Sequence, residues 1–178
     1  MSTTDGAVVA RYDRQLRPLI WGIVIASLIE AVALTLLLHR WPVIAWIHVA
    51  VCVLGLGFTW WSLRGYRNNP HTLQDNTLHL RYGRRIDVPV ALDAIAAATA
   101  TLRDAGTKTI GFTENTDGSA DLTLGVAGVA NATLRLERPI EVTIGKHGTR
   151  TVGRIHFRAD DPNPLLRAIN ERANVVTG

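Results

Sequence analysis

Cysteine is nearly absent from this chain of 178 residues, and the one cysteine, Cys52, lies within an apolar stretch. A disulfide within one chain needs two cysteines, so an extracellular domain stapled by disulfides is excluded. Lysine is almost as scarce, because 17 arginines and 2 lysines supply the positive charge of a chain whose net charge is +4. This arginine bias fits a GC-rich genome as well as any function, so it identifies no partner by itself.

Motifs for catalysis, metal binding and phosphate-loop binding are also lacking. Residues 125–128 have glycines at both ends but lack the lysine and helix of a phosphate-binding loop, and no Gly-x-Ser-x-Gly elbow occurs. Asp160 and Asp161, followed by Pro162, are typical of a helix cap rather than of an acid–base pair. Four histidines lack the close His/Cys spacing of a zinc site: His71, His79, His147 and His156. We therefore expect no catalytic residue, no metal and no cofactor.

Charge is scarce in two long hydrophobic runs. Residues 19–38 contain one charged side chain, Glu30, and residues 43–63 contain none. At about 1.5 Å per helical residue, each run is about 30 Å long, the thickness of a bilayer hydrocarbon core. The sequence therefore predicts a transmembrane helical hairpin over residues 19–63. The first run is longer than the apolar region of a signal peptide and no small-x-small site follows it, so we expect it to be retained.

Positive charge flanks the outer ends of the two runs, whereas the loop between them carries one arginine, Arg40. This asymmetry predicts a two-pass protein of the inner (plasma) membrane with both termini in the cytoplasm. Anionic head groups attract arginines at the inner surface by about 1 kcal/mol each. The alternative is that these arginines only set the topology and lie on a solvated face. The residues predicted at the head groups are Arg64, Arg67, Arg81, Arg84 and Arg85.

Glu30 is the one acidic side chain within the first run, and burying it near the bilayer centre costs about 3 kcal/mol. Helical rise places it at the depth of Cys52 on the second run, with His48 about one turn nearer the outside. We therefore predict an intramembrane polar pair, Glu30 and His48. The simpler interpretation is a protonated Glu30 that holds helices together or faces another protein.

The hydrophobic period changes to two after residue 70. Alternation in residues 77–82 and 86–90, on either side of Gly83, predicts a β-hairpin, and further alternating runs follow. Residues 91–101 favour a short turn and then a strand from Ile95. Apolar residues on one face predict a closing amphipathic helix after Pro162. The predicted fold class is an α+β membrane protein with about seven strands, divided into an N-terminal segment 1–18, the hairpin 19–63, a linker 64–72 and a β domain 73–174.

Several of these segments carry a resemblance to a known family. They are residues 73–83, residues 86–90 with Ile95, residues 154–158 and residues 160–166. With the preceding hairpin, they resemble bacterial membrane proteins that have pleckstrin-homology-like (PH-like) domains. The resemblance covers about residues 15–173 and implies a small antiparallel β-barrel or roll of two near-orthogonal sheets, plugged by the C-terminal helix. It implies an interaction or assembly module rather than an enzyme. The inositol-phosphate binding of eukaryotic relatives is not implied, because lysines do not line the first hairpin.

The functional hypothesis is a non-enzymatic, membrane-tethered binding or scaffold module. It would present its β domain at the cytoplasmic face to a protein partner or to anionic lipid head groups, and its membrane helices would contact the bilayer and a partner or a second copy. The alternative is an accessory subunit of a transporter or respiratory-type complex, with Glu30 against a partner helix. A second basic stripe lacks interleaved aromatics, so nucleic acid is not expected as a partner; it comprises Arg150, Arg154, His156 and Arg158.

Overall fold

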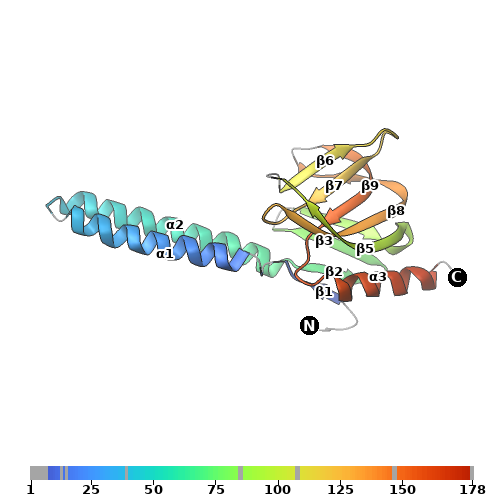
Figure 1. Ribbon diagram of the computed structural model, residues 1–178, viewed down its shortest axis with the longest axis horizontal. Helices are drawn as coiled ribbons and strands as arrows, with labels where there is room; N and C mark the ends of the chain where they lie inside the picture. The colour runs from blue at the N-terminus through green and yellow to red at the C-terminus, as the bar shows by residue number, and fades with distance from the viewer. Residues whose placement is uncertain are drawn as a thin grey trace.

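The computed structural model describes residues 8–12, 14, 16–38, 40–83, 86–106, 109–145 and 148–176. Two long helices, α1 (Leu16–Leu37) and α2 (Pro42–Asn68), form a hairpin that projects away from a β domain (Figure 1). Their large apolar side chains are exposed; Leu37 on α1 is 74% exposed and Leu54 on α2 is 72% exposed. Both helices are long and apolar enough to cross a membrane. They are therefore candidate membrane-spanning helices, as the sequence predicts.

Both helices extend beyond the predicted apolar runs at the end nearest the β domain. The predicted linker over residues 64–72 is mostly helical, because α2 continues to Asn68 and the next strand begins at His71. Pro70 disfavours a helical backbone in the residue that precedes it. Asn69 accordingly leaves the helical region, with φ −123° and ψ 67°. The connection between helix and β domain is therefore two residues long, which limits how far the two parts can move independently.

Nine strands among the described residues form two sheets, where the sequence predicted about seven strands. A four-stranded sheet has the order β1-β2-β3-β4, and a five-stranded sheet has the order β5-β8-β9-β7-β6. A 3₁₀ turn, η1 (Leu92–Ala94), links the sheets, and helix α3 (Asn163–Val176) closes the chain. The strands are β1 (Val8–Ala10), β2 (His71–Gln74), β3 (Thr77–Tyr82), β4 (Ile86–Ala91), β5 (Ile95–Asp104), β6 (Ile110–Glu114), β7 (Ala120–Leu124), β8 (Val129–Thr143) and β9 (Thr149–Phe157).

Strand β1 corrects the division of the chain into separate segments. Residues 1–18 were predicted to lie outside the β domain, but Val8 pairs with Leu73 and Ala10 pairs with His71 in an antiparallel ladder. A hairpin returns the chain to the place where it began, so the segments before α1 and after α2 lie side by side and can exchange backbone hydrogen bonds. The β domain therefore includes residues from both sides of the helical hairpin.

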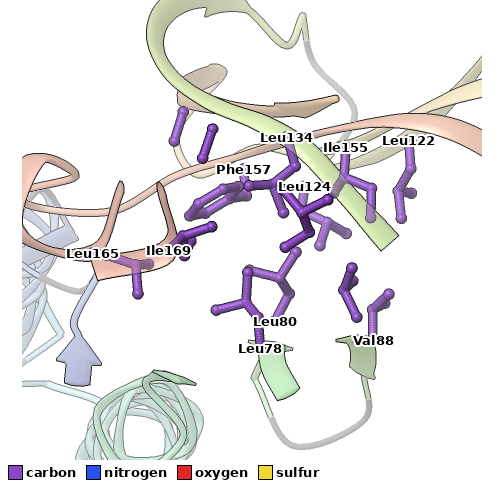
Figure 2. Close-up of a cluster of buried hydrophobic side chains, with 14 of the residues drawn as sticks. Leu78, Leu80, Val88, Leu122, Leu124, Leu134, Ile155, Phe157, Leu165 and Ile169 are labelled. Carbon is purple, nitrogen blue, oxygen red and sulfur yellow. The ribbon is translucent and has the colours of Figure 1, made fainter. Parts of the chain in front are cut away.

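The core lies between the two sheets and under α3, and it contains the apolar positions of the alternating runs (Figure 2). Leu78 and Leu80 from β3 face Leu134 on β8 and Ile155 on β9, and each of the four is fully buried. The predicted apolar face of the C-terminal helix is confirmed, because three of its members, Leu165, Leu166 and Ile169, are buried against the sheets.

The five-stranded sheet is mixed, which differs from the antiparallel roll that the resemblance implied. β9 lies between β7 and β8, antiparallel to β8 and parallel to β7. β7 and β8 are consecutive in the chain but are not neighbours in the sheet. The turn after β7 instead contacts the turn after β5: Ala105 N donates to Gly128 O at 2.8 Å, and Gly125 N donates to Thr109 O at 2.9 Å. A side chain at Gly125 would collide with the Cβ of Ala105, so glycine permits this close approach. On that side, β8 pairs with β9 and not with β7.

Candidate functional site

A buried tyrosine joins the two chain segments that enter and leave the helical hairpin. Tyr12 precedes α1 and is 1% exposed. Its hydroxyl donates to Asn69 O at 3.1 Å and accepts from Gly83 N at 2.9 Å. Its ring stacks on His71, with 4.8 Å between ring centroids. One side chain therefore holds the start of α1, the end of α2 and the β3–β4 turn together.

Asp160 and Asp161 have structural partners, as the helix-cap interpretation expects, and Asp161 bonds at the start of the helix. The Asp161 carboxylate accepts from Asn163 N at 3.2 Å, at the start of α3. The Asp160 carboxylate instead accepts from Arg14 N at 3.1 and 3.2 Å, and its own amide donates to Arg11 O at 2.7 Å. Asp160 therefore ties the segment before α1 to the segment before α3.

His71 lies fully buried beneath this junction. Its Nε2 donates to Arg158 O at 2.9 Å, and its ring meets Phe157 edge-on at 5.4 Å. Burial lowers the pKa of His71 from 6.5 to about 4, and the hydrogen bond to Arg158 opposes this only in part. His71 is therefore neutral at pH 7, and its contacts are those of a packing residue.

The predicted intramembrane pair is not joined in the part of the chain that the structure describes. Glu30 is exposed on α1. His48 is half-buried on α2, and its Nε2 lies 3.4 Å from the Sγ of Cys52 on the same helix. A direct contact between Glu30 and His48 stays a prediction, and the exposure of Glu30 leaves its carboxyl available to a neighbouring helix.

Exposure and ion pairing can be stated for two of the five arginines predicted at the membrane surface, Arg64 and Arg81. Arg84 and Arg85 lie outside the described residues, and the side chain of Arg67 is also not described. Arg64 is exposed near the end of α2. Arg81 on β3 is paired, because its Nε lies 3.4 Å from Asp87 Oδ2 on β4. The charge of Arg81 is therefore partly neutralised within its own sheet.

The structure also contains a basic groove that the sequence patterns did not predict as a unit. It lies on the face of the five-stranded sheet opposite the core, crosses β5, β8 and β9, and has a volume of about 520 Å³. No carboxylate is among its described lining residues, although the buried Asp121 lies beneath it, with Oδ2 3.5 Å from His156 Nε2. We call it the arginine groove, and its lining residues are Ala97, Thr99, Thr101, Leu102, Arg103, Thr133, Arg135, Arg154 and His156.

A β-bulge at Gly153 sets which side chains of β9 face the arginine groove. Ala120 on β7 pairs with Val152, but the next residue, Asp121, pairs with Arg154, so Gly153 is an extra residue in β9. Residues two positions apart share one face of a regular strand. Because of the bulge, Val152 is buried while Arg154 is exposed. A Cβ at Gly153 would lie 3.0 Å from Ser119 Oγ, which explains why a residue without a side chain fits here.

The floor of the arginine groove is a chain of polar contacts centred on His156. Arg103 Nη1 lies 2.6 Å from His156 Nε2 and 3.6 Å from Asp121 Oδ2. A guanidinium can only donate, so Nε2 accepts and the proton of the neutral ring is on Nδ1. Nδ1 then donates to the hydroxyl of Thr133 at 2.8 Å. Burial, and next the charge of Arg103, lower the pKa of His156, which keeps this ring neutral.

Two like charges stand opposite each other on the wall of the arginine groove. Arg135 on β8 and Arg154 on β9 are directly paired across the antiparallel ladder, and both side chains are exposed. Among the described residues, no carboxylate oxygen lies within 4 Å of either guanidinium. Arg154 acts at longer range on Asp117, whose pKa is lowered mainly by hydrogen bonds from Ser119 and to a smaller extent by this arginine. The groove therefore carries positive charge that its immediate surroundings leave uncompensated.

The predicted second basic stripe on β9 does not form one surface. Arg150 bonds to Glu114 at 2.7 Å and lies over the ring of Phe112 at 5.7 Å from its centroid. Arg158 is half-buried beside His71, whereas Arg154 and His156 line the arginine groove with Arg103 and Arg135. Nothing in the sequence indicated Arg103 or Arg135, because both come from strands whose register depends on bulges.

Comparisons of the chain with protein-family models, with curated proteins and with solved structures find no match.

Proposed function

We propose that this protein is a non-enzymatic binding module tethered to the inner (plasma) membrane. α1 and α2 cross the bilayer as a hairpin, and the β domain lies at the cytoplasmic face, where it binds a protein partner or anionic head groups. The observation that carries the proposal is the exposure of large apolar side chains along both helices, such as Leu37 at 74% and Trp46 at 74%. In water this surface would drive aggregation, whereas in a bilayer it is solvated by lipid.

The tether holds the β domain in a defined orientation, which suits a module that presents one surface. β1 and β2 are paired on either side of the hairpin, and the Tyr12 hydroxyl spans Asn69 and Gly83. Asp160 adds a second link to the segment before α1. The helices are therefore linked to the β domain by these contacts as well as by the two-residue connection at Asn69 and Pro70.

We further propose that the β domain is a PH-like domain. Two packed sheets with a C-terminal helix on their core support it. The parallel β7–β9 pair departs from the antiparallel roll of that family. We therefore propose the family for its architecture and carry over none of its binding sites.

The topology is tested with reporters fused after residue 178 and, separately, after Arg40 in the hairpin loop. We expect the C-terminal fusion to be active only with a cytoplasmic reporter and the loop fusion only with a reporter that works outside the cytoplasm. The protein should also stay with membranes during carbonate extraction. Reporters on the same side of the membrane, or release by carbonate, would contradict the proposal.

The second candidate is an accessory subunit of a membrane complex, and the exposure of Glu30 on α1 favours it. A carboxyl facing lipid is costly and is stabilised by a partner helix. Under this candidate, Glu30→Gln reduces the size of the complex extracted in mild detergent. Thr35→Val is the matched control, because the Thr35 hydroxyl already bonds to Ala31 O on its own helix at 2.6 Å. An unchanged complex with Glu30→Gln would argue against this candidate.

A further inference from the structure

We propose that the arginine groove binds the dianionic phosphate group of a phosphate monoester. This inference rests on the proposed function for the source of its ligand, which is either a lipid head group at the membrane or a soluble phosphate ester. The site lies on β5, β8 and β9, outside every segment that the sequence analysis assigned to the membrane surface.

Charge is the first argument. Arg103 lies 3.6 Å from Asp121, so its charge has a counterpart in the floor of the groove. Arg135 and Arg154 have no carboxylate within 4 Å among the described residues, so they add two uncompensated charges. A phosphate monoester carries a charge of about −1.5 to −2 at pH 7. The guanidinium group presents paired N–H donors that match two oxygens of one phosphate.

The pairing of Arg135 with Arg154 is the second argument. Like charges placed directly opposite on a sheet are destabilising, and neither side chain gains an ion pair within the described structure that would offset this. A bound anion placed between them would replace the repulsion with two attractive contacts. The arrangement therefore fits an occupied site better than it fits a solvated surface.

Hydroxyl groups beside the arginines are the third argument. His156 donates to the Thr133 oxygen at 2.8 Å, so the hydrogen of that hydroxyl is free to donate elsewhere, and Thr133 itself lines the groove. Thr99 is the cross-strand neighbour of Thr133 on β5 and lines the same groove. Ala97 and the exposed Leu102 supply apolar lining for the carbon part of an ester. A simple inorganic anion would leave that apolar lining unused.

The test uses the full-length protein in phosphatidylcholine nanodiscs, titrated with phenyl phosphate and with inorganic phosphate by calorimetry. We expect saturable binding that Arg135→Gln and Arg154→Gln each weaken by about tenfold or more. Arg138→Gln removes the same charge from the same strand but outside the groove, where Arg138 is 75% exposed and 3.9 Å from Asp93, and it should leave binding unchanged. Absence of saturable binding, or equal weakening by Arg138→Gln, would overturn the inference.

Folding is controlled independently of binding. Arg135→Gln removes one of two repelling charges, so its melting temperature should equal or exceed that of the unmodified protein. Arg135→Lys keeps the charge but loses the paired donors, and it should bind with intermediate affinity. If a long acidic peptide bound in an Arg135-dependent way and more tightly than phenyl phosphate, the ligand class would be wrong.

A second arm identifies the source of the phosphate. Nanodiscs containing phosphatidic acid present a monoester head group, whereas those containing phosphatidylglycerol present a diester with one negative charge. Weaker apparent binding of phenyl phosphate in phosphatidic acid nanodiscs, with no change in phosphatidylglycerol, would show a lipid ligand in the groove. Equal binding in both would show a soluble ligand. Carbonate extraction of the same variants reports on the tether alone, so failure of phosphate binding is distinguishable from failure of the proposed function.

Discussion

Two histidines of the β domain illustrate how side chains of one type acquire different roles from their surroundings. His71 is surrounded by Tyr12 and Phe157, and its one hydrogen bond goes to a backbone carbonyl. His156 lies in a polar network with Arg103 and Thr133 in the floor of the arginine groove. Both are held neutral, yet His71 stabilises the fold and His156 orients a hydroxyl. Sequence alone does not separate them, because the burial and the hydrogen-bond partners of each ring depend on residues that are distant in the chain.

The buried His71 predicts a stability that falls in weak acid. Its pKa is about 4 in the folded protein against 6.5 for a free histidine, so the unfolded chain binds more protons between these values. The free energy of unfolding therefore decreases as the pH falls from about 6.5 to about 4, by about 3 kcal/mol from this residue. Denaturant unfolding of the full chain in detergent, followed across this range, measures the change.

The control for this pH dependence is His71→Gln, which keeps a donor for Arg158 O but does not titrate. We expect a lower stability at pH 7 and a flatter pH profile than that of the unmodified protein. His156, whose pKa is also lowered, leaves a residual slope in the same direction. An equally steep profile in His71→Gln would show that the acid sensitivity comes from elsewhere.

At the scale of elements, the bulge in β9 decides what the arginine groove contains. Without the extra residue at Gly153, side chains of equal parity in β9 would share one face, and Arg154 would lie on the same side as Val152. The register shift in β8 between Arg135 and Ile140 has a similar effect, and Pro139 lies within it. Proline cannot donate to a ladder, so a shift at this position is expected.

Gly153→Ala tests this element. The added Cβ would lie 3.0 Å from Ser119 Oγ and 3.5 Å from its Cβ, so Ser119 must move and its hydrogen bond to Asp117, 2.7 Å long, is strained. We expect a loss of about 1 kcal/mol, as for small overpacking changes. Thermal or denaturant unfolding measures it.

Ser119→Ala provides the matched partner for a double-mutant cycle. It removes the Oγ that the new methyl group would meet, so Gly153→Ala should cost less in the Ser119→Ala background than alone. Additive effects in the double variant would mean that the two residues do not conflict.

For the whole molecule, the helical hairpin is an insertion into a β-hairpin. β1 and β2 pair as neighbours, with Ala10 opposite His71, although the two long helices separate them in the chain. The Tyr12 hydroxyl donates to Asn69 O, and the two long helices leave the β domain beside β1 and β2 (Figure 1). Among the described residues, the core cluster is made by the strands, η1, Ile144, Ala159 and α3, and none of its members comes from the two long helices.

This arrangement predicts that the β domain folds without the membrane helices. Replacing residues 13–68 with a Gly-Ser linker of about four residues keeps Tyr12 and Asn69 in place and leaves a loop of about eight residues between β1 and β2, still short for a compact domain. We expect a water-soluble monomer that unfolds cooperatively. Size-exclusion chromatography and circular dichroism measure this.

The same shortened protein with Tyr12→Ala is the comparison. It loses the stacking on His71 and the two hydrogen bonds of the hydroxyl, and large-to-small changes at buried aromatic positions typically cost about 3–5 kcal/mol. A shortened protein that aggregates regardless of Tyr12 would show that the helices support the β domain directly.

The sequence by itself determined the two apolar helices, the change to alternating strands near residue 70 and the amphipathic C-terminal helix. These features depend on local periodicity and on length, which are properties of neighbouring residues. The tertiary structure decided the pairing of β1 with β2, the parallel β7–β9 pair and the meeting of Arg103, Arg135 and Arg154 in one groove. Each of these depends on the register between distant strands, and one extra residue at Gly153 reverses which side chains face outward, so no local pattern could predict them.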